Sequence, residues 1–194
     1  MIYSIYGYGK AKTECAIGMM VRSIANHIPV VFAQFLKDGS SSEVAFLKMF
    51  NEVTYCNSNT KGFKYGDNIT RDMSALWAYV FDLVSSKRKG LIVLDEILVA
   101  YDLGFLSYNK IKKLITLARQ NNLNVCMTGR MNSKTKRMNI QILSDVVTDA
   151  YAVKHWFNTY CDRCKCEYEY YDKYCPKCGK KLKASRQTKK GIDF

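Results

Sequence analysis

The chain has 194 residues, 48% of them hydrophobic, which is enough for one sizeable core and a small additional unit. It contains no run of about 20 apolar residues and does not open on a signal peptide, so we expect no membrane-spanning helix and a cytoplasmic protein. The formal net charge of +13 suggests a polyanionic partner such as nucleic acid, but seven Lys and Arg residues between Lys177 and Lys190 make much of it local.

Strands and helices are predicted to alternate along the first 157 residues. Continuous apolar runs indicate strands buried on both faces, and amphipathic periodicity indicates helices between them. The expected strands are 2–6, 30–35, 53–55, 91–94, 125–127, 146–147 and 151–153, and the expected helices are 15–24, 43–50, 69–85, 108–120 and 140–143. This alternation predicts an α/β fold with a parallel sheet.

A glycine-rich segment follows the first expected strand and leads into a helix; it reads Gly7-Tyr8-Gly9-Lys10-Ala11-Lys12-Thr13. In such a segment, backbone N–H groups and the helix N-terminus bind phosphates, a lysine adds positive charge, and a threonine hydroxyl can bind Mg²⁺. The spacing is shorter than in the standard phosphate-binding motif. A flexible glycine turn without a ligand is therefore the alternative.

Two acidic residues, Asp95 and Glu96, close the apolar run 91–94. The carboxyl ends of parallel strands face the crevice in which α/β sheets bind ligands, and acids there commonly hold the Mg²⁺ of a bound nucleotide. Asp is also a common helix N-cap residue, which is the alternative role. Beside the glycine-rich segment, the pair favours a site for a nucleotide and Mg²⁺.

Five of the eight cysteines lie within residues 161–178. Cys161 and Cys164 form one C-x-x-C pair, and Cys175 and Cys178 form a second. This spacing is typical of a structural zinc site with four thiolates, which leaves no open position for catalysis. Cys166 is a surplus thiol and the alternative to Cys164 as a ligand.

Short motifs follow one another in a recognisable order: Gly7-x-Gly9-Lys10-x-Lys12-Thr13, Arg22, Gln34-Phe35-x-Lys37, Glu43, Gly62-Phe63-x-Tyr65, Leu94-Asp95-Glu96, Thr128-Gly129-Arg130, Asp145-x-Val147-Thr148, Lys154-His155 and Gly191-Ile192-Asp193-Phe194. The series resembles that of the P-loop ATP:corrinoid adenosyltransferases of cobalamin biosynthesis, over residues 2–157 and 189–194. The resemblance implies a fold like that of recombinase-type ATPases. It also implies transfer of the 5′-deoxyadenosyl group of ATP to the cobalt of cob(I)alamin or a corrinoid precursor, with release of triphosphate.

The resemblance also implies roles for individual residues. The ATP site would comprise Gly7, Gly9, Lys10, Ala11, Lys12, Thr13, Arg22, Asp95, Glu96 and Arg130. Within it, Lys12, the loop backbone and Arg22 would face the phosphates, while Thr13 and Glu96 would bind Mg²⁺. Lys12, Thr13 and Glu96 are the expected catalytic residues, because they act on the departing triphosphate.

For the corrinoid, the resemblance points to Phe63 and Tyr65, with tyrosine at a position where the family usually has tryptophan. These aromatic residues would lie against the lower face of the corrin and keep the lower axial position of cobalt free, which makes Co(II) easier to reduce. The alternative is a loop whose aromatic side chains only cover the edge of the core.

The sequence departs from the family pattern at two positions of the phosphate loop. Ala11 stands in place of glycine, which costs on the order of 1 kcal/mol if the backbone there needs a positive φ. Glu14 stands in place of a second threonine, and its carboxylate repels a triphosphate unless Mg²⁺ or Lys10 intervenes. Both changes weaken the prediction of efficient nucleotide binding.

We expect three parts: a P-loop core at 1–157 that binds nucleotide and corrinoid, a zinc ribbon at 158–188, and a C-terminal strand at 189–194 that returns to the core. The role of the ribbon stays open between a structural element, a lid, a dimer contact and a nucleic-acid surface formed by the basic tail and Tyr168, Tyr170, Tyr171 and Tyr174. A homodimer and a reducing flavoprotein partner also stay open.

Two other functions compete with adenosyl transfer. Type II thymidine kinases also join a P-loop core to a late zinc ribbon, but their acidic strand ends in Asp-Glu-Ala-Gln, whereas this chain has Asp95-Glu96-Ile97-Leu98. The third hypothesis is a binding protein that has lost enzymatic turnover because its phosphate loop is degenerate, and whose basic ribbon binds nucleic acid or a protein partner.

Overall fold

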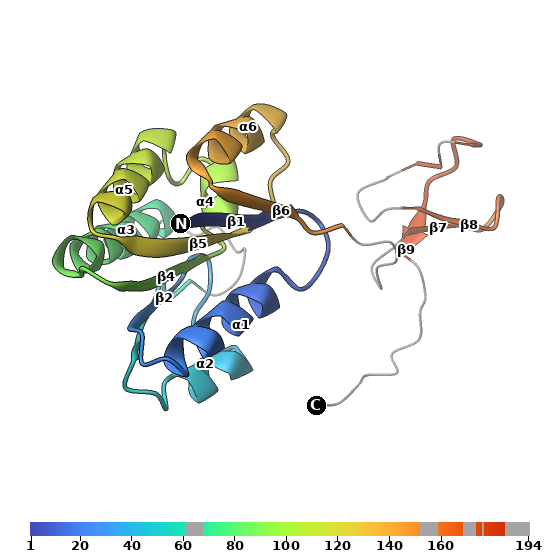
Figure 1. Cartoon of the computed structure of the whole chain (residues 1–194). Coiled ribbons are helices and arrows are strands. Elements are labelled where there is room, and N and C mark those ends of the chain that lie inside the picture. The colour runs from blue at the N-terminus through green and yellow to red at the C-terminus, as the bar shows by residue number, and fades with distance from the viewer. Residues whose placement is uncertain (61–67, 152–158, 169–173, 176, 185–194) are drawn as a thin grey trace. The chain divides into compact units, whose positions relative to one another are not determined.

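The computed structural model describes residues 1–60, 68–151, 159–168, 174–175 and 177–184 (Figure 1). The chain divides into two compact units, Met1–Tyr151 and Ala152–Phe194. The expected boundary at 157/158 and the expected strand at 189–194 lie outside the described residues. No helix in the described part of the chain is long and apolar enough to cross a bilayer.

A six-stranded sheet, in which every described pair of neighbours is parallel, forms the centre of the first unit. Its order is β3-β2-β4-β5-β1-β6. The strands are β1 (Ile2–Tyr6), β2 (Val30–Gln34), β3 (Val53–Asn57), β4 (Gly90–Asp95), β5 (Leu123–Gly129) and β6 (Val146–Asp149). Strands β2 and β4 are buried along their whole length, as continuous apolar runs predict. The predicted α/β fold with a parallel sheet is confirmed.

Helices cover both faces of this sheet (Figure 1). They are α1 (Lys12–Ile24), α2 (Ser42–Leu47), α3 (Ile69–Ser86), α4 (Ile97–Asp102), α5 (Tyr108–Gln120) and α6 (Lys134–Leu143). Helices α1 and α2 bury apolar side chains on one face, and α3 to α6 do so on the other. The two helix layers leave the carboxyl ends of β2, β4 and β5 as the edge at which polar side chains gather.

Four helices differ from the expectation: α1 begins at Lys12 and not at residue 15, α2 ends at Leu47 and not at residue 50, and α6 and α4 differ more. Helix α6 begins at Lys134 and not at residue 140, because the Ser133 hydroxyl caps it by accepting from the backbone N–H of Lys136. Helix α4 was not expected. Five of its six residues are buried, so it carries no amphipathic period by which a short helix could be distinguished from a strand.

The second unit contains a small antiparallel sheet in the order β8-β7-β9. Its strands are β7 (Thr159–Cys161), β8 (Cys166–Tyr168) and β9 (Lys183–Ala184), and an isolated bridge joins Tyr174 to Lys181. The four cysteines of the two C-x-x-C pairs belong to this unit.

Candidate functional site

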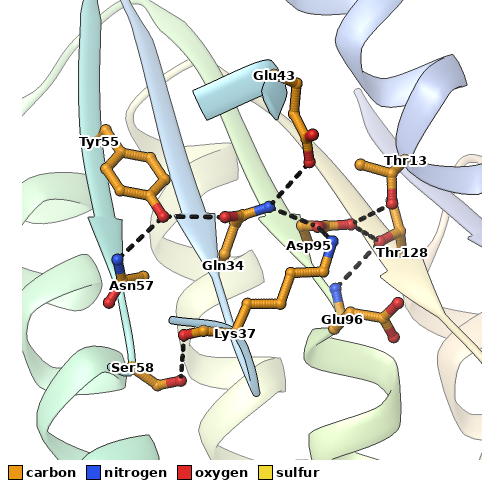
Figure 2. A network of polar contacts seen from close by, with 10 residues as sticks. All are labelled: Thr13, Gln34, Lys37, Glu43, Tyr55, Asn57, Ser58, Asp95, Glu96 and Thr128. Carbon is orange, nitrogen blue, oxygen red and sulfur yellow. Dashed lines mark hydrogen bonds and ion pairs between the residues drawn. The ribbon is translucent and has the colours of Figure 1, made fainter. Parts of the chain in front are cut away.

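The side chain of Asp95, fully buried at the end of β4, is the centre of the candidate site (Figure 2). Its Oδ1 accepts hydrogen bonds from the hydroxyls of Thr13 (2.9 Å) and Thr128 (2.6 Å). Its Oδ2 accepts from Gln34 Nε2 (3.2 Å) and Lys37 Nζ (2.7 Å). Four donors match the acceptor capacity of an ionised carboxylate, so the carboxylate is fixed in orientation.

Sheet topology explains why these donors meet. Gln34 ends β2 and lies opposite Asp95 in the register of β2 and β4. Thr128 lies in β5 on the other side of β4, and Thr13 is the second residue of α1, which follows β1. In parallel sheets the strand ends and the helix that follows a strand converge on one crevice, as expected from the sequence.

The network continues along the sheet from Gln34 toward β3 (Figure 2). The Gln34 side-chain oxygen accepts from the Tyr55 hydroxyl (2.9 Å), which itself accepts from Asn57 Nδ2 (3.0 Å). Gln34 Nε2 also lies 3.5 Å from the Glu43 carboxylate. The buried amide is thereby held in one orientation.

The glycine-rich loop is held against the end of β6. A Cβ on Gly7, whose φ is +114°, would collide with the carbonyl oxygen of Ala150, and one on Gly9 would lie 2.8 Å from the same oxygen. The Gly9 N–H donates to that oxygen (2.7 Å), while the Ala150 N–H donates to the Tyr6 carbonyl (2.7 Å). Both glycines therefore allow a close backbone approach.

Ala11 has φ 74° and ψ 3°, so it adopts the left-handed conformation at the N-cap of α1. The positive φ considered from the sequence is present. The next residue, Lys12, is only 9% exposed, and its Nζ lies 2.5 Å from the Gly9 carbonyl oxygen. Burial and the charge of Arg130 lower the pKa of Lys12, against the opposing effect of Glu96 and two other carboxylates.

Glu96 is the N-cap of α4 and also has a positive φ, of 60°, with no capping hydrogen bond from its side chain. Its N–H donates to the Thr128 hydroxyl at 3.1 Å. Burial and the neighbouring Asp95 raise the pKa of Glu96, while the charges of three cations, Lys37, Lys12 and Arg130, oppose the rise. Of the acidic pair, Glu96 and not Asp95 therefore stands at a helix N-cap, and its side chain does not cap the helix.

The structure brings Lys12, Thr13, Asp95, Glu96 and Arg130 together but not every predicted residue. Arg22 lies in the last turn of α1, about 15 Å from Lys12 by helical rise, so it does not reach the loop. Lys10 and Glu14 are exposed on the loop and the first turn of α1. Phe63 and Tyr65 lie outside the described residues.

Three residues of the site were not predicted as ligands. Gln34, Lys37 and Thr128 all bind Asp95, and all three stand in the motif series quoted above. The sequence does not give the strand order, and only the adjacency of β2, β4 and β5 places the three residues at one edge of the sheet.

The donor set fits a nucleotide phosphate with Mg²⁺. The hydroxyl hydrogen of Thr13 is committed to Asp95, so the oxygen keeps lone pairs for a cation. The Glu96 carboxylate could provide a second oxygen ligand of the kind that Mg²⁺ prefers. Lys12 and Arg130, whose charges both act on Glu96, could provide positive charge for a triphosphate.

In the second unit, Cys161, Cys164, Cys175 and Cys178 place their Sγ atoms within 4.8 Å of one another, as a tetrahedral metal site requires. The side chain of Cys166, the alternative ligand, is outside the described part of the chain. The two C-x-x-C turns therefore form a cluster of four thiols that could hold a metal ion.

The two cysteine turns have matching backbones. The N–H of Lys165 donates to the Cys161 carbonyl (2.9 Å), and the N–H of Gly179 donates to the Cys175 carbonyl (2.8 Å). Lys165 (φ 55°) and Gly179 (φ 68°) both adopt positive φ after their turns. The same turn is thus built twice, with glycine in only one of the two positions.

An ion-pair cluster connects the two turns. Asp162, inside the first, lies 2.9 Å from Lys180 and 3.0 Å from Lys183, both of which follow the second. Because these side chains are partly exposed, the pairs are screened and orient the turns more than they stabilise them.

Comparison with known proteins agrees with this geometry. A family model described as ATP:corrinoid adenosyltransferase BtuR/CobO/CobP matches residues 1–165. A corrinoid adenosyltransferase of Pseudomonas aeruginosa is 31% identical over 156 residues, which cover 78% of this chain and 74% of that protein. One from Sinorhizobium sp is 26% identical over 159 residues, covering 79% and 72% respectively.

Proposed function

The chain belongs to the ATP:corrinoid adenosyltransferase family and is a transferase, and we propose that it moves the 5′-deoxyadenosyl group of ATP to the cobalt of a reduced corrinoid, releasing triphosphate. The observation that carries the proposal is the convergence of Lys12, Thr13, Glu96 and Arg130 around the buried Asp95. It provides cations for a triphosphate and oxygen ligands for Mg²⁺ at one strand edge.

In the proposed reaction, a Co–C5′ bond forms and the C5′–O bond breaks, and its electron pair leaves with the triphosphate. Reduced cobalt is a strong nucleophile, so the protein needs neither a general base nor a covalent side chain. Its tasks are to align C5′ with cobalt, neutralise the leaving group and exclude water.

Of these tasks, the described site would neutralise the leaving triphosphate. Lys12 would leave the Gly9 carbonyl and pair with the triphosphate, for which its buried position prepares it. Thr13 and Glu96 would hold Mg²⁺, which neutralises developing negative charge on the triphosphate. Ala11 and Glu14 would lower the affinity for the triphosphate relative to the family pattern, but Lys12, Thr13 and Glu96 are all retained.

The corrinoid site is proposed from the family pattern. Phe63 and Tyr65 would lie against the lower corrin face and keep that side of cobalt free of a ligand. Starting from Co(II), the reaction consumes one electron, for which we propose a reduced flavoprotein as donor. Phe63→Ala should therefore impair turnover from Co(II) much more than turnover with pre-reduced Co(I). Equal losses with both substrates would remove Phe63 from this role.

The deciding assay combines the protein, ATP, Mg²⁺ and chemically reduced cobalamin, and follows loss of the cob(I)alamin absorbance and release of triphosphate. Stoichiometric release of triphosphate with adenosylcobalamin supports the proposal. Bound ATP without any adenosylation would favour a binding protein that retains the fold. Phosphorylation of thymidine without adenosylation would favour the kinase, for which the chain lacks the Ala-Gln after Asp95-Glu96.

For the cysteine cluster we propose a structural zinc ion bound by Cys161, Cys164, Cys175 and Cys178. Four thiolates close the coordination sphere, so the ion takes no part in adenosyl transfer. Metal analysis should find about one zinc per chain, and Cys166→Ser should leave that content unchanged. If Cys166→Ser loses zinc and Cys164→Ser retains it, Cys166 and not Cys164 is the zinc ligand.

A further inference from the structure

Lys37 reaches the centre of the site because of an unusual backbone turn. The residue before it, Leu36, has φ 57°, and its side chain is 2% exposed. A left-handed conformation costs a residue other than glycine about 1–2 kcal/mol. A bulky buried leucine in that conformation is held by its surroundings, and strained positions of this kind cluster at functional sites.

The backbone of Lys37 is fixed from the other side. Its carbonyl oxygen accepts from the Ser58 hydroxyl (3.3 Å) and from the N–H of Thr60 (3.3 Å). Figure 2 shows the side chain running from this anchor back to Asp95, to which its Nζ donates. The lysine is thus directed at one acceptor.

Lys37 is the charged donor among the four that bind Asp95; the others are two hydroxyls and an amide. Its Nζ lies 2.7 Å from Oδ2, and the two side chains are 28% and 0% exposed. A buried carboxylate is costly unless it is paired and hydrogen-bonded. Burial alone would lower the pKa of Lys37, but the Asp95 carboxylate, together with Glu96 and Glu43, outweighs burial and raises it.

The orientation of Thr13 depends on the same carboxylate. Its hydroxyl donates to Oδ1, the oxygen opposite the one that Lys37 binds. If the carboxylate turned or moved, the hydroxyl would lose its acceptor and could direct its hydrogen toward a cation, which is repulsive. Lys37 is therefore placed to control a group that it does not touch.

We propose that Lys37 is a positioning residue for Mg²⁺: it fixes Asp95 so that the Thr13 oxygen presents lone pairs to the metal of Mg–ATP. This inference rests on the proposed function of the site. It gives Lys37 no contact with the phosphates, unlike Lys12. Lys37 is consequently needed for the contribution of Mg²⁺ to nucleotide binding and is dispensable for binding of metal-free ATP.

The test measures ATP affinity by calorimetry with Mg²⁺ and with EDTA, for the parent protein and for Lys37→Met. The gain in affinity due to Mg²⁺ should fall by about 10–100-fold, the range for loss of a residue that orients a metal ligand. Affinity in EDTA should stay unchanged. Lys37→Arg, which keeps the charge and a donor, should restore part of the gain.

Lys110→Met is the matched control. Lys110 Nζ also contacts side chains, 3.3 Å from the Ser74 hydroxyl and 5.3 Å from the centre of the Trp77 ring. These residues lie on helices α3 and α5 and take no part in the Asp95 network. This variant should leave both affinities unchanged. If Lys37→Met fails to fold, Lys37→Gln, which loses the charge but keeps a donor, provides the same comparison.

An equal loss of affinity with Mg²⁺ and in EDTA would make Lys37 a direct phosphate ligand and overturn the proposal. An unchanged Mg²⁺ gain would overturn it as well. The adenosylation assay tests the proposed reaction separately. If Mg²⁺ raises the ATP affinity of the parent protein but not of Lys37→Met, and the parent protein transfers no adenosyl group, the proposed reaction is refuted and the role of Lys37 is retained.

Discussion

Replacing Ala11 by glycine should stabilise the first unit, because this alanine adopts a conformation that glycine adopts without strain. At φ 74° and ψ 3°, the left-handed backbone costs alanine about 1–2 kcal/mol. Glycine gives back about 0.4–1 kcal/mol through its greater freedom in the unfolded chain. The net gain is about 0.5–1 kcal/mol in the free energy of unfolding, or about 1–4 °C in Tm for a chain of this length.

Urea denaturation followed by far-UV circular dichroism measures this gain as a shift of the midpoint at constant slope. Ala25→Gly is the matched control, since Ala25 ends the same helix in the right-handed conformation, with φ −59°. It should destabilise by about 0.4–1 kcal/mol, because glycine there only adds freedom to the unfolded chain. The reasoning is refuted if Ala11→Gly lowers the free energy of unfolding as Ala25→Gly does.

Three further changes test the nucleotide site and the cysteine cluster. Lys12→Ala should weaken ATP binding by about 1.5–3 kcal/mol, the value of a hydrogen bond to a charged group, and calorimetry that finds parental affinity would place the triphosphate elsewhere. Glu14→Thr should strengthen ATP binding, most clearly at low salt, because it removes a negative charge from the first turn of α1; weaker binding would show that Glu14 contributes to the site. Cys175→Ser should abolish zinc binding while the urea midpoint of the first unit stays unchanged, and retained zinc would remove Cys175 from the ligands.

The sequence allowed the fold and the centre of the site to be predicted because both depend on local patterns. Unbroken apolar runs indicated the strands β2 and β4, and their parallel arrangement implied a common ligand edge. Asp95 and Thr13, at the ends of such elements, were thereby expected near each other, and the structure connects them directly. The spacing of the two C-x-x-C pairs likewise predicted that four cysteines would lie close together, as they do in the structure.

The positions of Lys37 and Arg22 relative to the site could not be predicted, for opposite reasons. Lys37 reaches Asp95 through a left-handed Leu36, a conformation that leucine rarely adopts and that no local pattern indicates. Arg22 was assigned from its place in the motif series, but helical rise carries it to the far end of α1. Sequence order alone gives neither the direction of a side chain nor the distance along a helix that separates two motif positions.

The hydrogen bond from Gly9 to Ala150 has a consequence for solvent exchange of the loop amides. The Gly9 N–H is satisfied by the Ala150 carbonyl oxygen of the same chain, at 2.7 Å. Its deuterium exchange in the nucleotide-free protein should therefore follow the opening of the β6 end and be slow for a loop position. If ATP recruited this amide, the strand end would first have to detach. Unchanged protection of Gly9 on ATP addition would show that the triphosphate is held by the remaining amides and the Lys12 side chain.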